Sequence, residues 1–479
     1  PTSKEPLGVP FDEQHTGRGR AVAGFDLVFT VPKSASVLWA LGDEPTRRAV
    51  VEAHRTALTQ ALDFLEDKVA RARVGAGGSR QVRTGGLIAA GFEHVDSRLN
   101  DPNLHTHLVV ANKVQGLDGK WRSLDGRTIL AATVAVSELY DGLYADELSR
   151  RLGVTWHLRD RGERRSPAFA IDGLPDELLE HFSARTAQVD AAQTAWELGF
   201  VATHGRTPTP LEITKKRDQL TRTTRPAKVL RPIAELFEEW ANRARALTGL
   251  EPRDLAARAL VGDYARGLNA HDVADETYEV LVTQVIADVQ ARAATFTAWN
   301  LTAAAGRATR ELRMASPDER IRLVARLVTA AAARCVRLDG GQIHRVGEAR
   351  YATPTTLAAE QDLLATASAL LPLAAPNGPQ VAWAWRDGPP LTADQRNAVT
   401  AVLTSGRVVD TVVGAAGTGK TTTLRAVARA WLLFHPCEVL ALAPSATAAH
   451  VLGDALGVRA ETTAKWLFET QERPATGDD

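Results

Sequence analysis

The feature that most constrains the fold is a cluster of three histidines in a chain that has only twelve. His94, His105 and His107 lie within fourteen residues, and the last two belong to an apolar run from Leu104 to Val110. Side chains two positions apart in a strand point to the same face. Both imidazoles are therefore expected on one face of a strand, opposite Leu104, Thr106, Leu108 and Val110.

The residues before this strand predict how His94 joins the pair. Residues 101–103, Asp-Pro-Asn, are typical of a turn, and an antiparallel hairpin through that turn would bring His94 beside His105 and His107. A single histidine on a strand is usually a core or surface residue. Three neutral imidazoles from two strands instead predict a divalent-metal site with positions left open for substrate. The residue types do not separate zinc, manganese and magnesium.

The hairpin also carries a family resemblance. The string from Phe92 to Asn112, F-E-H-x-x-S-R-x-x-D-P-x-L-H-T-H-x-V-V-A-N, resembles the metal hairpin of the MobF-type conjugative relaxases, the relaxase–helicases of plasmid transfer. These belong to the His-hydrophobe-His endonucleases, although Thr106 fills the middle position here. The resemblance implies that the histidines hold a metal against the scissile phosphate of single-stranded DNA. A tyrosine then attacks and stays joined to the 5′ end.

A second candidate residue lies in a strand expected from Gly24 to Val31. Phe25, Leu27 and Phe29 would form its apolar face, with Asp26 on the other. A carboxylate in such a strand needs a partner. The segment resembles the family pattern G-[YF]-D-L-x-F-x-x-P-K-S, which implies a catalytic Asp26 that orients a metal-binding imidazole or takes the tyrosine proton. The alternative is a hydrogen-bonded aspartate at a strand edge.

Three basic residues are candidates for DNA contact. Arg98 belongs to the hairpin string, and Arg225 and Lys228 belong to a segment that resembles the T-R-x-x-K sequence closing the family's relaxase domain. Phosphate contacts suit them, and a solvated basic turn is the alternative. The same two interpretations apply to the arginines of Gly17–Arg20.

Periodicity predicts the elements around these motifs. Helices are expected over residues 45–73, 129–152 and 174–198, a turn over 75–78, and strands over 154–158 and 168–171. His54 in the first helix is expected to be a surface or core histidine and not a ligand. Tyr140 and Tyr144 lie in the middle of the second helix, where they are poor candidates for a nucleophile.

A second motif lies near the C-terminus. Residues 407–413 are rich in β-branched residues and predict a strand, which is followed by Gly-Ala-Ala-Gly-Thr-Gly-Lys-Thr and a helix. This is a phosphate-binding loop in its required strand–loop–helix context. Backbone N–H groups would close around the phosphates, the lysine would reach the β and γ oxygens and a threonine would bind Mg²⁺. The predicted ATP and Mg²⁺ residues are Gly414, Gly417, Gly419, Lys420, Thr421, Thr422 and, by resemblance to the adenine-reading segment of superfamily 1 helicases, Gln395.

The residues after this loop resemble RecD-like helicases. Residues 439–443 predict a second buried strand, and the loop at 444–447 and the segment 462–467 resemble DNA-contacting motifs of that group. No Walker B Asp-Glu pair, arginine finger or second motor domain follows in these 479 residues. We therefore expect weak nucleotide binding without unwinding.

Together these motifs predict three parts. Residues 1–240 are expected to form an α+β relaxase domain with an antiparallel sheet, and residues 241–385 a mainly helical connector with a small strand near Arg350. Residues 386–479 are expected to form the first part of an α/β P-loop helicase domain.

Composition adds few constraints. Lys+Arg and Asp+Glu are equal at 57 each, which does not exclude a nucleic-acid protein because only its groove must be basic. Cys335 and Cys437 lie far apart, so no disulfide framework is expected, as suits a reducing cytoplasm. No apolar run reaches the ~18 residues of a membrane span, and no signal-peptide pattern is present. A cytoplasmic protein without membrane insertion is expected.

The resemblance implies a relaxase–helicase that nicks one strand at a transfer origin and unwinds DNA with ATP. It also implies relaxosome accessory proteins and a type IV secretion coupling protein as partners. The first residue is Pro1, the only methionine is Met314 and no tyrosine precedes Tyr140. We therefore interpret the sequence as an internal fragment that binds single-stranded DNA and metal but does not cleave.

Two alternatives remain open on the sequence. One is a DNA-binding remnant without enzymatic activity. The other is an unrelated metallohydrolase fused to an ATPase, which would need a carboxylate to activate water. Glu93 is the nearest candidate, but it should point away from its neighbour His94 if both lie on one strand.

Overall fold

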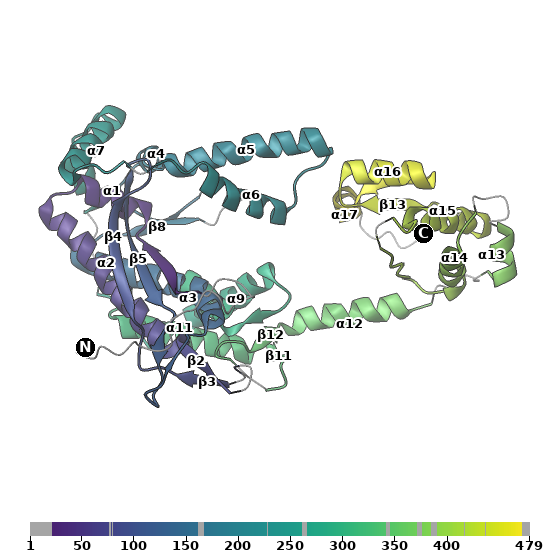
Figure 1. Ribbon diagram of the computed structural model, residues 1–479, viewed down its shortest axis with the longest axis horizontal. Coiled ribbons are helices and arrows are strands. Elements are labelled where there is room, and N and C mark those ends of the chain that lie inside the picture. The colour runs from purple at the N-terminus through teal and green to yellow at the C-terminus, as the bar shows by residue number, and fades with distance from the viewer. Residues whose placement is uncertain are drawn as a thin grey trace, which may run out of the picture. The chain divides into compact units, whose positions relative to one another are not determined.

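The computed structural model describes residues 22–471, apart from residues 76–77, 79, 161–166, 228, 261–265, 342–344, 371–375, 385–389, 416 and 436. The chain divides into two compact units, and Figure 1 labels many of their elements. Unit 1 comprises residues 1–187 and 225–356, and unit 2 comprises residues 188–224 and 357–479. Each unit contains a hydrophobic core of its own.

The centre of unit 1 is an antiparallel sheet with the strand order β1-β5-β4. Its strands are β1 (Gly24–Thr30), β4 (Ala89–Asp96) and β5 (Pro102–Ala111). Alternate side chains of β5 are buried, namely those of Leu104, Thr106, Leu108 and Val110. His105 and His107 lie on the other, partly open face. The predicted alternation is confirmed, and one face of the sheet remains accessible.

Three helices share a core with the buried face of this sheet, namely α1 (Lys33–Leu41), α2 (Glu44–Phe64) and α3 (Gly126–Leu152). Helix α2 begins after Asp43, whose carboxylate accepts the Thr46 N–H at 3.0 Å, as an N-cap residue does. Helix α3 ends at Gly153 with a φ of 71°, a left-handed conformation that glycine adopts without strain. The predicted end of this helix is confirmed.

The helix predicted over residues 45–73 is shorter than expected. It changes at Leu65–Val69 into a π-helical turn, η2, and Arg71–Val74 form strand β2, which pairs with β3 (Arg80–Arg83). Leu65, Val69 and Ala72 are all buried. Apolar side chains therefore continue at regular intervals through the change from helix to strand. For this reason the hydrophobic periodicity of the sequence did not show where the helix ends.

The helix predicted over residues 174–198 is two helices, α4 (Asp176–His181) and α5 (Ala184–His204). Phe182 between them is fully buried. The Ala184 N–H donates to the Asp101 carboxylate at 2.9 Å, a bond to a residue far away in the sequence. This tertiary contact separates the helices although the periodicity continues across the break.

The remaining elements of unit 1 surround this core. The predicted strands near residues 156 and 350 are confirmed as β8 and β12. The full set is β6 (Val114–Gln115), β7 (Trp121–Arg122), β8 (Trp156–Arg159), β9 (Ala168–Ile171), α7 (Ile233–Thr248), α8 (Pro252–Ala259), α9 (Asp275–Arg292), β10 (Phe296–Thr297), α10 (Ala298–Ala308), α11 (Pro317–Ala333), β11 (Val336–Arg337) and β12 (Arg350–Ala352).

A buried ion pair joins α3 to α11. The guanidinium of Arg320 donates to both carboxylate oxygens of Asp146, at 2.8 and 2.7 Å, and both side chains are almost fully buried. Arg320 also donates to the backbone carbonyls of Thr309 and Leu312, at 2.8 and 2.6 Å. A guanidinium with this many acceptors is satisfied inside a core. The ion pair therefore holds a helix of the predicted connector against a helix of the predicted relaxase domain.

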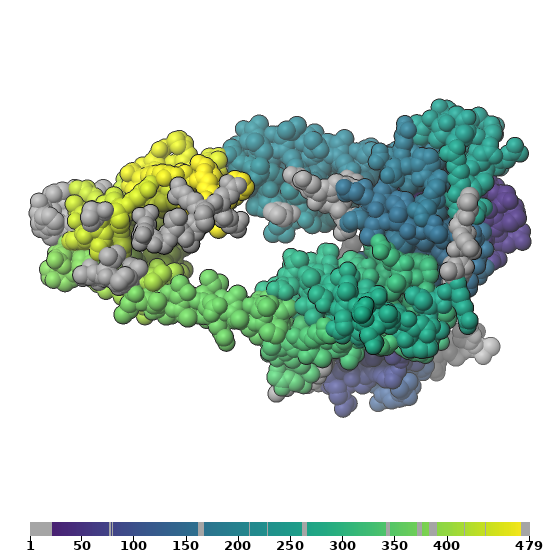
Figure 2. All heavy atoms as spheres, turned by 180° about the vertical axis from the view of Figure 1, so that it is seen from behind, coloured from purple at the N-terminus to yellow at the C-terminus, as the bar shows by residue number. Residues whose placement is uncertain are grey.

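The core of unit 1 does not stop at residue 240. Trp240, Leu255 and Trp299 belong to the same buried cluster as the sheet and α1–α3. On the face shown in Figure 2, teal and green residues from this part of the chain form much of the surface of unit 1. The assignment of three domains stays a prediction. The shared core shows that residues of the predicted connector pack against the predicted relaxase domain.

Unit 2 contains helices and one short parallel sheet, β13-β14. Its small core is formed by Val381, Leu391, Val399, Leu403, Ala426 and Ala430. The elements of this part of the chain are residues 188–204 of α5, α6 (Pro210–Thr223), α12 (Pro354–Ser368), α13 (Gly378–Ala384), α14 (Ala393–Ser405), α15 (Lys420–Phe434), β13 (Leu440–Ala443), α16 (Ala446–Leu456), β14 (Arg459–Thr462) and α17 (Thr463–Gln471).

The strand predicted over residues 407–413 is not formed. Within the described residues, the only β pairing of this segment is an isolated bridge between Arg407 and Leu370, and the side chain of Val413 is 90% exposed. A β-branched run becomes a strand only when neighbouring strands pair with it. The β13-β14 pair does not extend to this segment.

In the part of the chain that the structure describes, no helix combines the length and apolar character needed to cross a bilayer.

Candidate metal centre

Three imidazoles converge on the open face of the sheet. His94 on β4 pairs directly with His105 on β5, and His107 follows two residues later on the same face. The ring centroids lie 5.2, 5.2 and 5.3 Å apart. One nitrogen from each ring lies within 4.8 Å of the others. The predicted convergence of the three histidines is confirmed.

The turn of the hairpin lies earlier than predicted. The Asn100 N–H donates to the Ser97 carbonyl at 3.0 Å, and Asn100 adopts a left-handed φ of 58°. Pro102 and Asn103 already belong to β5. Proline is acceptable as the first residue of a strand, where it need not donate to the ladder. The turn residues are therefore 97–100 and not 101–103.

Hydrogen bonds at Nδ1 orient two of the rings. His107 Nδ1 lies 2.8 and 2.9 Å from the two carboxylate oxygens of Asp26. His105 Nδ1 lies 2.7 Å from the backbone carbonyl of Asn103. A histidine that donates through Nδ1 coordinates through Nε2, and a carboxylate or carbonyl acceptor fixes its tautomer and orientation. This donor set fits a divalent metal.

Asp26 reaches His107 because of the strand register. On β1, Asp26 pairs with Val109, so His107 is its diagonal neighbour on the same face. Diagonal neighbours across antiparallel strands lie within reach of each other's side chains. Asp26 is exposed while Phe29 on the other face of β1 is buried, as the sequence predicted.

The same face of the sheet carries apolar side chains beside the histidines. Val28, Phe92 and Val109 are 51%, 55% and 41% exposed, and Val28 and Phe92 pair with His107 from either side. The charged and metal-binding groups are thus bordered by apolar surface that the described residues leave uncovered.

Glu93 does not face this site. Its carboxylate accepts two hydrogen bonds from the Arg55 guanidinium of α2, at 2.6 and 2.7 Å. The Arg55 hydrogen bond and charge lower the pKa of Glu93. A carboxylate in a bidentate pair is a poor base for water, which counts against the alternative of a metallohydrolase that uses Glu93.

Neither Tyr140 nor Tyr144 can reach the site, because both are buried in α3. His54 is also fully buried, and its ring nitrogens lie 2.7 Å from the hydroxyls of Tyr140 and Thr106. The prediction of a core or surface histidine is confirmed, because His54 lies in the core. Sequence reasoning missed these two hydrogen bonds, and only the polar Thr106 in an otherwise apolar row hinted at them.

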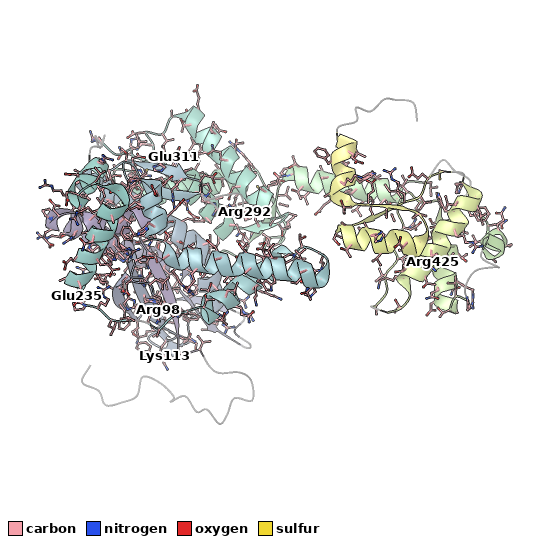
Figure 3. The ribbon with its side chains drawn as sticks, turned by 90° about the horizontal axis from the view of Figure 1, so that it is seen from above. Arg98, Lys113, Glu235, Arg292, Glu311 and Arg425 are labelled. Carbon is pink, nitrogen blue, oxygen red and sulfur yellow. The ribbon has the colours of Figure 1, made fainter. Side chains whose placement is uncertain are left out.

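The candidate DNA contacts are only partly described. Arg98 lies in the hairpin turn and is half-buried, and Figure 3 labels it in unit 1. Arg225 is exposed after the end of α6. Lys228 and Gly17–Arg20 lie outside the described residues.

The phosphate-binding loop of unit 2 leads into α15, as predicted. Gly417 and Gly419 both have a φ of 80°, and Lys420 is the first residue of the helix, followed by Thr421 and Thr422. Lys420 Nζ donates to the carbonyls of Gly414 and Ala415, at 2.7 and 2.8 Å. The lysine therefore lies folded onto its own loop, where a phosphate would compete with these carbonyls.

Gln395 is brought to this loop. Its side-chain N–H donates to the Thr418 carbonyl at 3.1 Å, and its side-chain oxygen accepts the Thr392 N–H at 2.9 Å in a capping box. The structure thus places the predicted adenine-reading glutamine beside the predicted phosphate loop. The strand that should precede the loop is missing, as described above.

Two family models match the chain. One, described as TrwC relaxase, matches residues 1–247, and another, described as an AAA domain, matches residues 390–478. Together they cover the metal hairpin and the phosphate-binding loop.

Curated relatives match over shorter segments. The multifunctional conjugation protein TraI of Escherichia coli is 30% identical over 192 residues, which is 39% of this chain and 10% of that protein. TraI of E. coli strain K12 is 33% identical over 152 residues, which is 31% of this chain and 8% of that protein. The chain thus matches about a tenth of the length of these relatives.

The chain also matches solved structures of a relaxase. The conjugative relaxase TrwC in complex with OriT DNA matches in a metal-free and a metal-bound form, each at 28% identity over 50% of this chain. The matches cover 79% and 77% of those chains, with TM-scores of 0.41 and 0.42. Because the relaxase family model matches more than half of the 479 residues, the chain belongs to the TrwC relaxase family.

Proposed function

We propose that the chain is the relaxase part of a MobF-type conjugative relaxase–helicase, which binds single-stranded DNA at a transfer origin beside a divalent metal ion. The observation that carries the proposal is the convergence of His94, His105 and His107 beside Asp26 on an open sheet face. Zinc, manganese and magnesium remain the candidate ions.

The proposal gives a separate role to each group of candidate residues. A divalent ion held by the three histidines would polarise the oxygens of a DNA phosphate. Asp26 would hold the His107 ring through Nδ1, which makes it a positioning residue for the metal. The exposed Phe92 offers a surface on which a base can stack. Arg98, Arg225 and Lys228 are proposed to contact phosphates.

Residues 1–479 are proposed to bind DNA without cutting it. In the family mechanism a tyrosine attacks the phosphate, but Tyr140 and Tyr144 are buried away from the open face. The proposal therefore gives metal and DNA binding to this segment and assigns no nucleophile within it. A covalent 5′-phosphotyrosyl product formed by residues 1–479 would contradict this part.

The remaining assignments follow from the family and the second motif. We propose that ATP and Mg²⁺ bind at Gly414–Thr422 with Gln395, and that this region belongs to a helicase that unwinds DNA. Accessory proteins of the relaxosome and a coupling protein of a type IV secretion system are the proposed partners. The cytoplasm is the proposed location.

The test compares histidine–aspartate pairs inside and outside the site. His107→Ala should weaken Mn²⁺ binding at least 100-fold, and Asp26→Asn about 10- to 100-fold, as loss of outer partners does at metal sites. His157→Ala is the matched control, because Nδ1 of His157, a residue of β8, forms a similar 2.6 Å pair with Asp172. Calorimetric titration with Mn²⁺ measures the affinities.

DNA binding is measured in parallel. The anisotropy of fluorescein-labelled oligonucleotides of random sequence should show Mn²⁺-enhanced binding of single strands, and weaker binding of duplexes. Retention of Mn²⁺ affinity by His107→Ala would overturn the metal site. Metal binding without any effect on single-stranded DNA would overturn the relaxase assignment.

A further inference from the structure

A buried polar network lies directly behind the metal face. Thr106 stands between His105 and His107 on β5 and points to the opposite side of the sheet, where it is 1% exposed. His54 of α2 and Tyr140 of α3 continue the network, and both are buried. The network contacts the metal strand without contacting the metal face.

The hydrogen bonds of this network are short and well matched. His54 Nε2 lies 2.7 Å from Thr106 Oγ1, and His54 Nδ1 lies 2.7 Å from the Tyr140 hydroxyl. A neutral imidazole has one donor and one acceptor, and each hydroxyl can play either part. Burial lowers the pKa of His54 to about 4, so the ring is neutral near pH 7. Both bonds are satisfied in either tautomer.

These bonds fix the one residue of β5 that separates the two ligands. Successive side chains of a strand project to opposite faces, so the backbone that holds Thr106 inward also sets the direction of His105 and His107. A buried polar group that loses its partner carries a penalty. Rotation or outward movement of β5 is therefore opposed by the two hydroxyls and the imidazole.

The next residue of α2 holds the other ligand-bearing strand. Arg55 donates two hydrogen bonds to Glu93, which precedes His94 on β4. Consecutive residues of one helix thus contact β5 and β4, each next to a metal histidine. Of these two ties, only the one through His54 is buried.

We propose that His54 is a positioning residue for the metal site, which acts through Thr106 to hold His105 and His107 in the arrangement that binds a divalent ion. This inference rests on the proposed metal binding by the triad. It also explains the threonine at a position where the endonuclease pattern has an apolar residue, because a valine there would leave His54 without one partner.

The experiment removes single hydroxyl groups and follows the metal. Thr106→Val should lower Co²⁺ affinity about 10-fold, the lower end of what an outer partner contributes to a metal site. It should also change the visible absorption spectrum of bound Co²⁺, which reports coordination geometry. Thr106→Ser keeps the hydroxyl and should restore both. Tyr140→Phe should have the same effects as Thr106→Val, but smaller.

Tyr144→Phe is the matched control, because the Tyr144 hydroxyl is buried one helical turn away and has no hydrogen-bond partner among the described residues. It should leave Co²⁺ affinity and spectrum unchanged. If Thr106→Val does not fold, Tyr140→Phe carries the test, since it keeps the ring.

Two results separate the inference from the function on which it rests. Failure of the unmodified chain to bind Co²⁺ would overturn both. Normal Co²⁺ affinity and spectrum in folded Thr106→Val and Tyr140→Phe would overturn the positioning role alone. In that case a lower melting temperature of the metal-free variants would show that the network only stabilises the fold.

Discussion

The two candidate sites differ in how they are supported. The metal site of unit 1 lies on paired strands, with Asp26 and Asn103 orienting its rings and a buried network behind it. The phosphate-binding loop of unit 2 has its helix and its glycine conformations but no strand before it, and Lys420 bonds to its own loop.

The difference follows from where each site obtains its hydrogen bonds. A hairpin pairs residues close in sequence, so β4 and β5 provide most of the metal site between them. A P-loop strand is central in a parallel sheet and needs neighbours that come from distant segments. The metal hairpin can therefore form from its own residues, whereas the phosphate-binding loop lacks a strand that only a wider sheet would provide.

The largest expected effect tests the buried support of unit 1. Asp146→Ala leaves the buried Arg320 guanidinium without its carboxylate, which should cost about 3–5 kcal/mol of unfolding free energy. Hydrogen exchange, measured as the protein is denatured, should show that the loss of stability is largest in α3 and α11. Glu438→Ala in unit 2 is the control, because its ion pair with Arg459 lies at the surface, with both side chains more than half exposed, and should matter little. Equal losses in the two variants would remove the contrast between the units.

The next effect depends on pH. Burial lowers the pKa of Lys33, whose Nζ donates to the Pro102 carbonyl next to the hairpin turn, from 10.5 to about 8. Between these values the unfolded chain binds more protons than the folded one, so stability should rise with pH, by roughly 3 kcal/mol in total. Lys33→Met should lack this rise. Urea denaturation of both proteins from pH 7 to pH 11 measures it, and a rise that persists in the variant would contradict the assignment.

The smallest effects come from ligands. A divalent metal at about 100 times its Kd should stabilise unit 1 by about 2.7 kcal/mol, whereas ATP–Mg²⁺ at a concentration near its Kd should stabilise unit 2 by only about 0.4 kcal/mol. Hydrogen exchange in β5 and α15 would report each unit, and a chelator should reverse the first effect. If ATP–Mg²⁺ protected α15 from hydrogen exchange more than the same concentration of metal protects β5, unit 2 and not unit 1 would hold the stronger binding site.

The sequence was informative where a pattern is local. Alternation in β5 predicted which face carries the histidines, and the spacing of Asp26 in an apolar strand predicted that it needs a partner. The unpredicted features depend on distant contacts. The break before α5 needs Asp101, the bonds of His54 need Thr106 and Tyr140, and the strand expected before Gly414 needs neighbouring strands. No single segment contains the information for these.

The alternation of β5 has one more consequence. A hairpin paired one residue out of register would turn Leu104, Leu108 and Val110 to solvent and bury the imidazoles. Such a molecule would be a misfolded isomer unable to bind metal. Retention on an immobilised-metal column would therefore separate correctly paired chains from misaligned ones after refolding, and the bound fraction would measure the refolding yield.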